Sequence, residues 1–204
     1  PDIRTSGDIF SVPKFDLDRN DVEDFHETLQ GFHAEFRDCF AREEGRNNLS
    51  YYTIGQFSQM ERKSIEPMAL NVEGAKVRAV QRFISEATWD ANRMMHIYRS
   101  MVNDDMGEES GVLILDESGF KKKGSDSAGV YKQYCGNIGK VDNCQVGVFA
   151  AYASSQGYAL LDKELFVPEA WFGDDYEERR DKCQFPVDLQ FKTKPQIAAR
   201  MVND

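Results

Sequence analysis

Asp116 is the residue whose surroundings most favour a chemical role. It directly follows a short apolar run, residues 112–115 (VLIL), which is typical of a buried central strand. A carboxylate at the end of such a strand lies at the edge of the sheet, where many α/β proteins bind ligands and metals. The alternative is an ordinary turn or cap residue before Gly119, and spacing alone slightly favours that alternative.

Two groups of basic side chains are candidates for contacts with nucleic-acid phosphates. The first group lies just after Asp116 and consists of Lys121, Lys122, Lys123, Lys132 and Lys140. The second group falls in a region with helical periodicity and consists of Arg62, Lys63, Lys76, Arg78 and Arg82. A solvated charged surface explains the first group equally well. Spacing alone does not show which face of the helices would contact DNA.

The cysteines and histidines do not form a recognisable metal site. Cys39, Cys135, Cys144 and Cys183 include no CxxC pair, and their wide spacing matches no common zinc pattern. We therefore expect reduced and mostly buried thiols. The histidines His26 and His33 are seven residues apart on one face of a predicted helix, where a solvated or core-edge position is favoured over a metal site.

Composition indicates a chain with a real core and an acidic surface. Of its 204 residues, 41% are hydrophobic, yet no apolar run approaches the length that a membrane helix needs. The N-terminus has no apolar signal-peptide stretch, so we expect a cytoplasmic protein without a membrane partner. The formal net charge of -10 argues against non-specific nucleic-acid binding by the chain as a whole, although acidic clusters can coexist with a basic face.

The first half of the chain has the periodicity of helices. Its longest apolar stripe repeats at intervals of three and four and consists of Val22, Phe25, Leu29, Phe32, Phe36 and Phe40. Asp18 or Asn20 is a suitable N-cap for this helix, and Gly45 a suitable end. Further helices are predicted over residues 65–74, 77–84 and 89–101, followed by a polar linker at 103–111.

The second half changes to a strand pattern. Strands are predicted at residues 112–115, 130–134, 145–152, 158–166 and, shorter, 188–191, with a hairpin turn at 154–157 and a helix opening near Pro195. The fold class is therefore α/β, of the α+β type. A helical N-terminal part precedes the beginning of an RNase H-like mixed sheet, which is incomplete at the C-terminus.

Several spaced motifs around Asp116 resemble one known family. Asp116 is followed by Ser118-Gly119, and the motifs after it are KKG (122–124), GVYKQY (129–134) and GKVDNCQV (139–146). This series resembles the region around the first catalytic aspartate of DDE-type bacterial insertion-sequence transposases, where the Asp is followed by a short Thr/Ser-Gly turn. The segments 61–66, 81–84, 160–172 and 191–195 resemble other parts of the same family, so the likeness covers nearly the whole chain after about Asp21.

The resemblance implies a function on DNA. Residues 1–106 would be a helical DNA-binding domain, and residues 107–204 the first part of an RNase H-like catalytic domain. The chemistry would be metal-dependent DNA cleavage and strand transfer at transposon ends, with two Mg²⁺ or Mn²⁺ ions held by three carboxylates. Asp116 would be the first of these and would bridge both ions. DNA ends and target DNA would be the partners, a homodimer on DNA is a further expectation, and the protein would associate with the bacterial nucleoid.

The same resemblance implies that two catalytic carboxylates are missing. The second Asp and the final Glu of the family lie downstream of the stretch that matches residues 193–195. Glu117, Asp162, Glu164 and Glu169 do not occupy those positions, and Glu117 is expected to point away from Asp116 because neighbouring strand residues face opposite sides. We therefore expect a truncated or shortened product that is inactive alone. Two other readings are a non-catalytic DNA-binding or regulatory protein derived from a transposase, and an unrelated acidic interaction domain.

Overall fold

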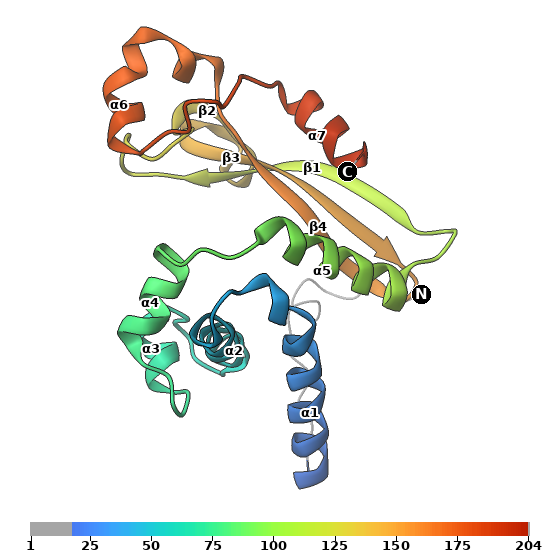
Figure 1. Cartoon of the computed structure of the whole chain (residues 1–204). Helices are drawn as coiled ribbons and strands as arrows, with labels where there is room; N and C mark the ends of the chain where they lie inside the picture. Colours follow the sequence, from blue (N-terminus) through green and yellow to red (C-terminus); the bar gives the residue numbers. More distant parts are fainter. Residues whose placement is uncertain (1–17, 204) are drawn as a thin grey trace. The chain divides into compact units, whose positions relative to one another are not determined.

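The computed structural model describes residues 18–203 as helices followed by an antiparallel sheet and a final helix (Figure 1). This arrangement confirms the predicted α+β class and the order of elements expected for the start of an RNase H-like domain. The chain forms two compact units that divide between Met94 and Met95, and each unit is described by itself. Among the described residues, no helix is both long and apolar enough to cross a bilayer.

The first helix begins as predicted but ends earlier. Helix α1 spans Arg19–Glu35, and its N-cap Asp18 forms a reciprocal pair with Asp21, in which each backbone N–H donates to the other carboxylate at 3.0 and 2.9 Å. The predicted end at Gly45 is wrong. A 3₁₀ turn, η1 (Arg37–Cys39), follows α1, and Gly45 lies inside the next helix, α2 (Glu43–Phe57), against the Phe40 ring.

The apolar stripe predicted for the first helix is buried only at its C-terminal end, in the residues that follow α1. No residue of α1 is buried, and the side chains of Val22 and Phe25 are about half exposed, whereas Phe36 and Phe40 are buried. The core of this unit lies where Phe40, Phe83 and Trp89 meet, with the Phe83 and Trp89 rings stacked at 5.0 Å. Helices α3 (Ile65–Leu70) and α4 (Val77–Ser85) add Met68, Ala69 and Val80, and they confirm the helices predicted there.

The second unit contains the sheet, in which β3 is the central strand. The strands are β1 (Val112–Lys121), β2 (Tyr131–Cys135), β3 (Lys140–Ser154) and β4 (Gly157–Phe166), and every pairing among them is antiparallel. β1 pairs with one edge of β3, while β2 and β4 follow each other along the other edge. The predicted turn at 154–157 is confirmed, because β3 and β4 meet there with Gly157 at a φ of 150°.

Three predictions for this unit are corrected. Residues 112–115 form a strand but not a buried one: their side chains are 37–56% exposed, because β1 pairs only with β3 among the described residues. Helix α5 (Ala91–Met106) covers half of the predicted linker, which leaves residues 107–111 as loop. Residues 188–191 form no strand, since Leu189 closes a turn by donating its N–H to the Pro186 carbonyl.

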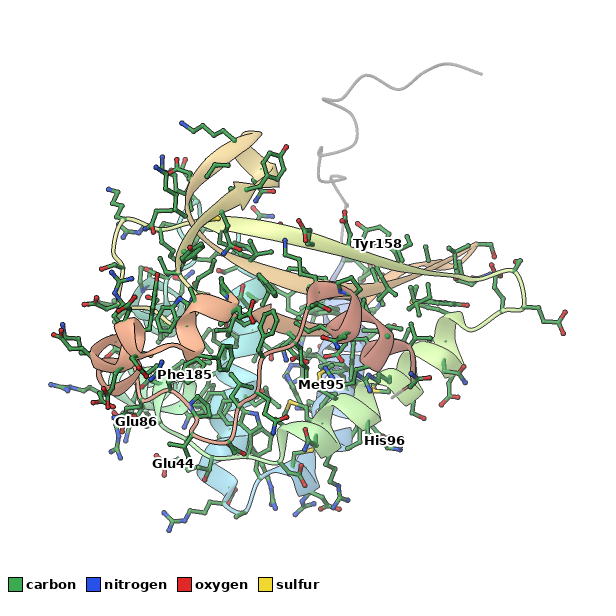
Figure 2. The ribbon with its side chains drawn as sticks, turned by 90° about the horizontal axis from the view of Figure 1, so that it is seen from above. Glu44, Glu86, Met95, His96, Tyr158 and Phe185 are labelled. Carbon is green, nitrogen blue, oxygen red and sulfur yellow. The ribbon has the colours of Figure 1, made fainter. Side chains whose placement is uncertain are left out.

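Two groups of side chains pack against the sheet. Helix α7 (Lys194–Asn203) lies beside it in both views (Figures 1 and 2), and Ile197 and Met201 of this helix pack on Val148 and Ala150 of β3. After β4 come the turns η3 (Glu169–Phe172) and η4 (Asp174–Tyr176) and helix α6 (Glu177–Lys182). Trp171 of η3 packs with Tyr176 and Phe185, and its Nε1–H donates to the Val130 carbonyl at 3.0 Å. The α7 contacts lie on β3, the strand that pairs with β1 and Asp116.

Candidate functional site

Asp116 lies in the middle of β1 and not at its end. The strand continues for five residues beyond it to Lys121, so the expected turn at Ser118-Gly119 is instead extended strand. The predicted position at a strand end is therefore wrong, because antiparallel pairing with β3 persists past the apolar run. The carboxylate is exposed, and its hydrogen bond is local: Oδ1 accepts the Glu117 backbone N–H at 2.8 Å.

Register assigns Asp116 to the sheet face opposite α7. Asp116 stands opposite Phe149 of β3, which in turn stands opposite Lys163 of β4. The next row is Glu117, Val148 and Glu164, and Val148 packs against α7. Because adjacent rows alternate between faces, Asp116 and Glu117 point to opposite sides of the sheet. Glu117 forms an ion pair with Lys194 at the start of α7, as its predicted orientation away from Asp116 requires.

The other carboxylates of the sheet are held by cations on the α7 face. Asp162 is 8% exposed, and its Oδ2 lies 2.9 Å from Arg99 Nη2 of α5. Glu164 Oε2 lies 2.6 Å from Nη2 of Arg200, which also reaches Asp162 at 3.7 Å. Beside this network, α5, α7 and the sheet enclose a hollow of about 390 Å³. Its position on the face opposite Asp116 separates it from the candidate catalytic carboxylate.

The segment after β2 is fastened to β1 just beyond Asp116. The turn η2 (Gly136–Ile138) carries Asn137, whose Nδ2 donates to the Gly119 carbonyl at 2.7 Å. The Ser118 hydroxyl, on the same face of β1 as Asp116, lies 3.5 Å from Asn137 Oδ1. A Cβ on Gly119 would lie 2.7 Å from Cys135 Sγ, so this position needs a glycine for the close approach. Sequence reasoning missed Asn137, for which the flanking glycines were the available signal.

The structure gathers the five lysines of the first basic group around the start of β3. Lys121 ends β1 opposite Cys144, Lys132 of β2 stands opposite Asn143, and the Lys122 N–H donates to the Asn143 carbonyl at 2.9 Å. Lys121 and Lys140 share Asp142, with Nζ to Oδ2 distances of 3.0 and 3.8 Å. The hydrogen bond from Lys121 holds the pKa of the Asp142 carboxyl below its usual value. Lys122, Lys123 and Lys132 have no ion-pair partner among residues 18–203.

The second basic group lies in the helical unit and is partly engaged. Arg62 and Lys63 are exposed in the turn before α3, and Lys63 Nζ donates to the Gln56 carbonyl at 2.6 Å. Arg82 of α4 forms an exposed ion pair with Glu86, four residues later, at 3.2 Å. Within the described residues Arg62 has no such partner. Arg62 is therefore available to a ligand, and so are Lys76 and Arg78, which are exposed and have no ion-pair partner in the same part of the chain.

The described part of the chain contains no cluster of three or more His, Cys, Asp or Glu side chains able to hold a metal ion. The cysteines are free, as predicted: Cys39, Cys135 and Cys144 are buried, and Cys183 is partly buried. Burial raises the pKa of the Cys39 and Cys144 thiols, which keeps them protonated at neutral pH. Asp116 thus stands as a single exposed carboxylate rather than as part of an assembled metal centre.

Comparison with known proteins agrees with the motif series. Residues 35–204 match the family described as DDE superfamily endonuclease. Over 155 residues the chain is 29% identical to a probable transposase for insertion sequence element IS701 from Microchaete diplosiphon, an alignment that covers 76% of this chain and 37% of that relative. The chain thus spans little more than a third of the length of that relative. No solved structure matches the chain. Because the family match covers most of its length, this chain belongs to the DDE superfamily endonucleases.

Proposed function

We propose that this chain is part of a DDE transposase that cleaves DNA and transfers strands at the ends of an insertion sequence, with Asp116 as its first catalytic carboxylate. One observation carries the proposal. Asp116 is an exposed carboxylate on the open face of β1, whereas Glu117, Asp162 and Glu164 on the other face are each paired with a lysine or an arginine. A carboxylate left unpaired by the fold is available for metal or substrate.

The described residues do not fit a pair of divalent ions by themselves. Two-metal chemistry needs several oxygen ligands from carboxylates that converge on one point. Asp116 supplies one such ligand, and the neighbouring carboxylates of the sheet face the other way. Mg²⁺ or Mn²⁺ therefore stays a proposal that rests on the family, and we derive no catalytic step through such ions from these residues.

DNA is the proposed partner, and two surfaces are available for its phosphates. The lysines around the start of β3 lie on, or directly after, strands of the sheet that carries Asp116, and Arg62, Lys63 and Arg82 lie in the helical unit. We assign residues 1–106 to DNA binding and residues 107–204 to the first part of the catalytic domain. A homodimer on DNA stays a prediction.

A second candidate function is non-catalytic DNA binding by this chain, in a regulatory role. It is favoured by the lack of any three-carboxylate cluster in the part of the chain that the structure describes. Both candidates share DNA as the ligand, and they differ in whether the second Asp and the Glu are supplied from elsewhere. In the first case Asp116 has a catalytic role, and in the second it has none.

The test is Asp116→Asn in a transposase that contains this segment together with the two further carboxylates. Asn keeps the shape of the side chain but removes the charge that would bind divalent ions, so we expect DNA cleavage to be lost. Binding to transposon-end DNA should persist, because it would rest on lysine and arginine contacts to phosphates. Cleavage and gel-shift assays with Mg²⁺ measure the two effects. Wild-type cleavage by Asp116→Asn would remove Asp116 from the site, and Asp188→Asn is a control that should leave cleavage unchanged.

A further inference from the structure

In the helical unit, α1, η1 and α2 enclose a polar hollow of about 240 Å³. The polar residues that line it are Gln30, His33, Arg37, Arg46, Asn47 and Ser50. The first three are separated by three and four positions, and Arg46 and Ser50 by four, so helical geometry turns both sets toward the hollow. These residues belong to the helical unit, whereas Asp116 belongs to the sheet unit, and none of them is a member of the basic groups described above.

The lining of this hollow is positively charged and contains no carboxylate. Two arginines contribute to it in a chain that has 35 acidic residues against 25 basic ones, so the local charge is opposite to that of the chain. Asp38, the acidic neighbour of Arg37 in sequence, forms an ion pair with Arg93 at 3.0 Å. The field in the hollow therefore favours an anion.

Of the two arginines in the hollow, Arg46 is held in place by hydrogen bonds, whereas the guanidinium of Arg37 is available to a ligand. Arg46 donates through Nε and Nη2 to the carbonyls of Arg37 and Phe40, at 3.0 and 3.2 Å, which fixes its guanidinium between η1 and α2. Among residues 18–203, the Arg37 guanidinium has no hydrogen-bond or ion-pair partner. It is therefore free to form a two-pronged contact with an incoming oxyanion.

His33 adds a buried group that lacks a partner. Its Nε2 is shielded from solvent and has no hydrogen-bond partner in the described part of the chain, although buried polar atoms in proteins are nearly always paired. Burial also lowers the pKa of His33, so the ring is neutral at pH 7 and its Nε2 can carry a proton as a donor. Asn47 and Ser50 offer further neutral donors of the kind that proteins use to contact phosphate.

We propose that this hollow binds a phosphate group of the DNA backbone and so fixes the helical unit on its DNA. The inference rests on the proposed function, which supplies DNA as the partner. The ligand is a phosphate because two arginines, an imidazole, an amide and a hydroxyl surround one small space, and it carries no information about base sequence. Inorganic phosphate shares this chemistry and is the competing source of the ligand.

The test uses the whole 204-residue chain labelled with ¹⁵N and titrated separately with a short DNA duplex and with inorganic phosphate. We expect the His33 ring and the backbone amides of Arg37 and Ser50 to shift with DNA and to saturate. Arg37→Gln should weaken DNA binding several-fold and reduce the dependence of log Kd on log salt concentration by about one phosphate contact. Asn47→Asp, which places a carboxylate in the hollow, should weaken binding as well.

The matched control is Arg19→Gln, which removes the same charge from the other end of α1, where Arg19 is exposed and pairs with Glu23. Equal losses from Arg37→Gln and Arg19→Gln would overturn the proposal, as would shifts with inorganic phosphate but not with DNA. DNA binding that shifts the lysines of β1 and β2 while the hollow stays silent would also overturn it and leave the proposed function standing. Saturable shifts in the hollow, together with normal cleavage by Asp116→Asn, would support the hollow and refute the catalytic role proposed for Asp116.

Discussion

Asp116 and Asp162 show that one residue type has two different surroundings in the same sheet, exposed and, within residues 18–203, unpaired for Asp116 and buried in an ion pair for Asp162. The sequence indicated Asp116 as a candidate site residue, because an apolar run precedes it and the surrounding motifs resemble those of a known family. The role of Asp162 was not predictable in that way. Its partner Arg99 lies 63 positions earlier in the chain, and only the packing of α5 near β4 brings the two together. A buried ion pair between distant positions leaves no local pattern in a sequence.

At the residue scale, we expect Gly119→Ala to disturb the strand that carries Asp116. The new Cβ would lie 2.7 Å from Cys135 Sγ and 3.1 Å from Cys135 Cα, and the second contact is with backbone that cannot rotate away. Overpacking of this kind costs about 1–3 kcal/mol in the free energy of unfolding. Urea unfolding followed by Trp171 fluorescence, in a Trp89→Phe background, measures the second unit by itself. Gly136→Ala is the control, since its Cβ would meet nothing within 4 Å and should change stability little.

At the scale of elements, prediction succeeded where burial follows a local period. Helix α4 and strand β3 bury apolar side chains at regular intervals, and both were found. Helix α2 was missed because its buried residues are Asn48 and Gly55, which form no apolar stripe. Gly55 serves the close approach of α3, where a Cβ would lie 2.9 Å from Met68 Cβ. For β1, the apolar run predicted the strand but not the number of its neighbours, since strand pairing is set by distant residues.

Glu108 in the loop between α5 and β1 is hydrogen-bonded to Ser155, and the stability that these bonds contribute is expected to depend on pH. Hydrogen bonds from the Ser155 N–H and hydroxyl, at 2.7 and 2.8 Å, lower the pKa of the Glu108 carboxyl from its usual 4.5. A depressed pKa in the folded state means that the stabilisation is present above the unfolded pKa and is lost as pH falls through the folded pKa. The stability difference between wild type and Glu108→Gln should therefore be largest near neutral pH and shrink below about pH 4.5.

Thermal unfolding of both proteins from about pH 7 to about pH 3 measures this difference. Glu109→Gln is the matched control, because Glu109 is exposed and has no partner among the described residues. It should show no pH-dependent difference from wild type. A stability difference between wild type and Glu108→Gln that stays constant down to the lowest pH would contradict this role of the Glu108 carboxylate.

A second link between elements joins α5 to β4 through Arg99 and Asp162. Asp162→Asn removes a charge that is 8% exposed and leaves the cations of Arg99 and Arg200 without their shared carboxylate. Breaking such a pair costs more than breaking a surface pair, and we expect about 2 kcal/mol, because Arg99 retains some solvent contact. The measurement is again unfolding followed by Trp171. Glu178→Gln, which breaks an exposed pair with Lys182 on α6, should cost clearly less because solvent screens that pair, and equal losses from both variants would refute the difference in burial.

At the scale of the whole molecule, the chain has a negative net charge but contains local groups of positive side chains. The net charge of -10 argued against DNA binding, yet five lysines flank the start of β3 and two arginines line a hollow without carboxylates in the helical unit. Composition sums over the surface and therefore cannot predict such local fields. The predicted division at residue 106 and the compact units that divide after Met94 both assign the sheet to the second part. α5 belongs largely with the sheet because Arg99 and Val102 face it.

The last expectation concerns the activity of the 204-residue chain by itself. Cleavage of a phosphodiester by two metals needs carboxylates that converge, and Asp116 is the only sheet carboxylate of the described residues that the fold leaves unpaired on its face. The purified chain should therefore bind DNA weakly, with an affinity that falls as salt rises, and should not nick transposon-end DNA when Mg²⁺ or Mn²⁺ is added. A supercoiled plasmid carrying the end sequence detects single nicks, and Asp116→Ala measures any background from contaminating nuclease. Metal-dependent nicking that disappears in Asp116→Ala would mean that the chain completes its own metal site, for example by pairing with a second copy. Nicking that persists in Asp116→Ala would instead belong to the contaminant and leave the expectation intact.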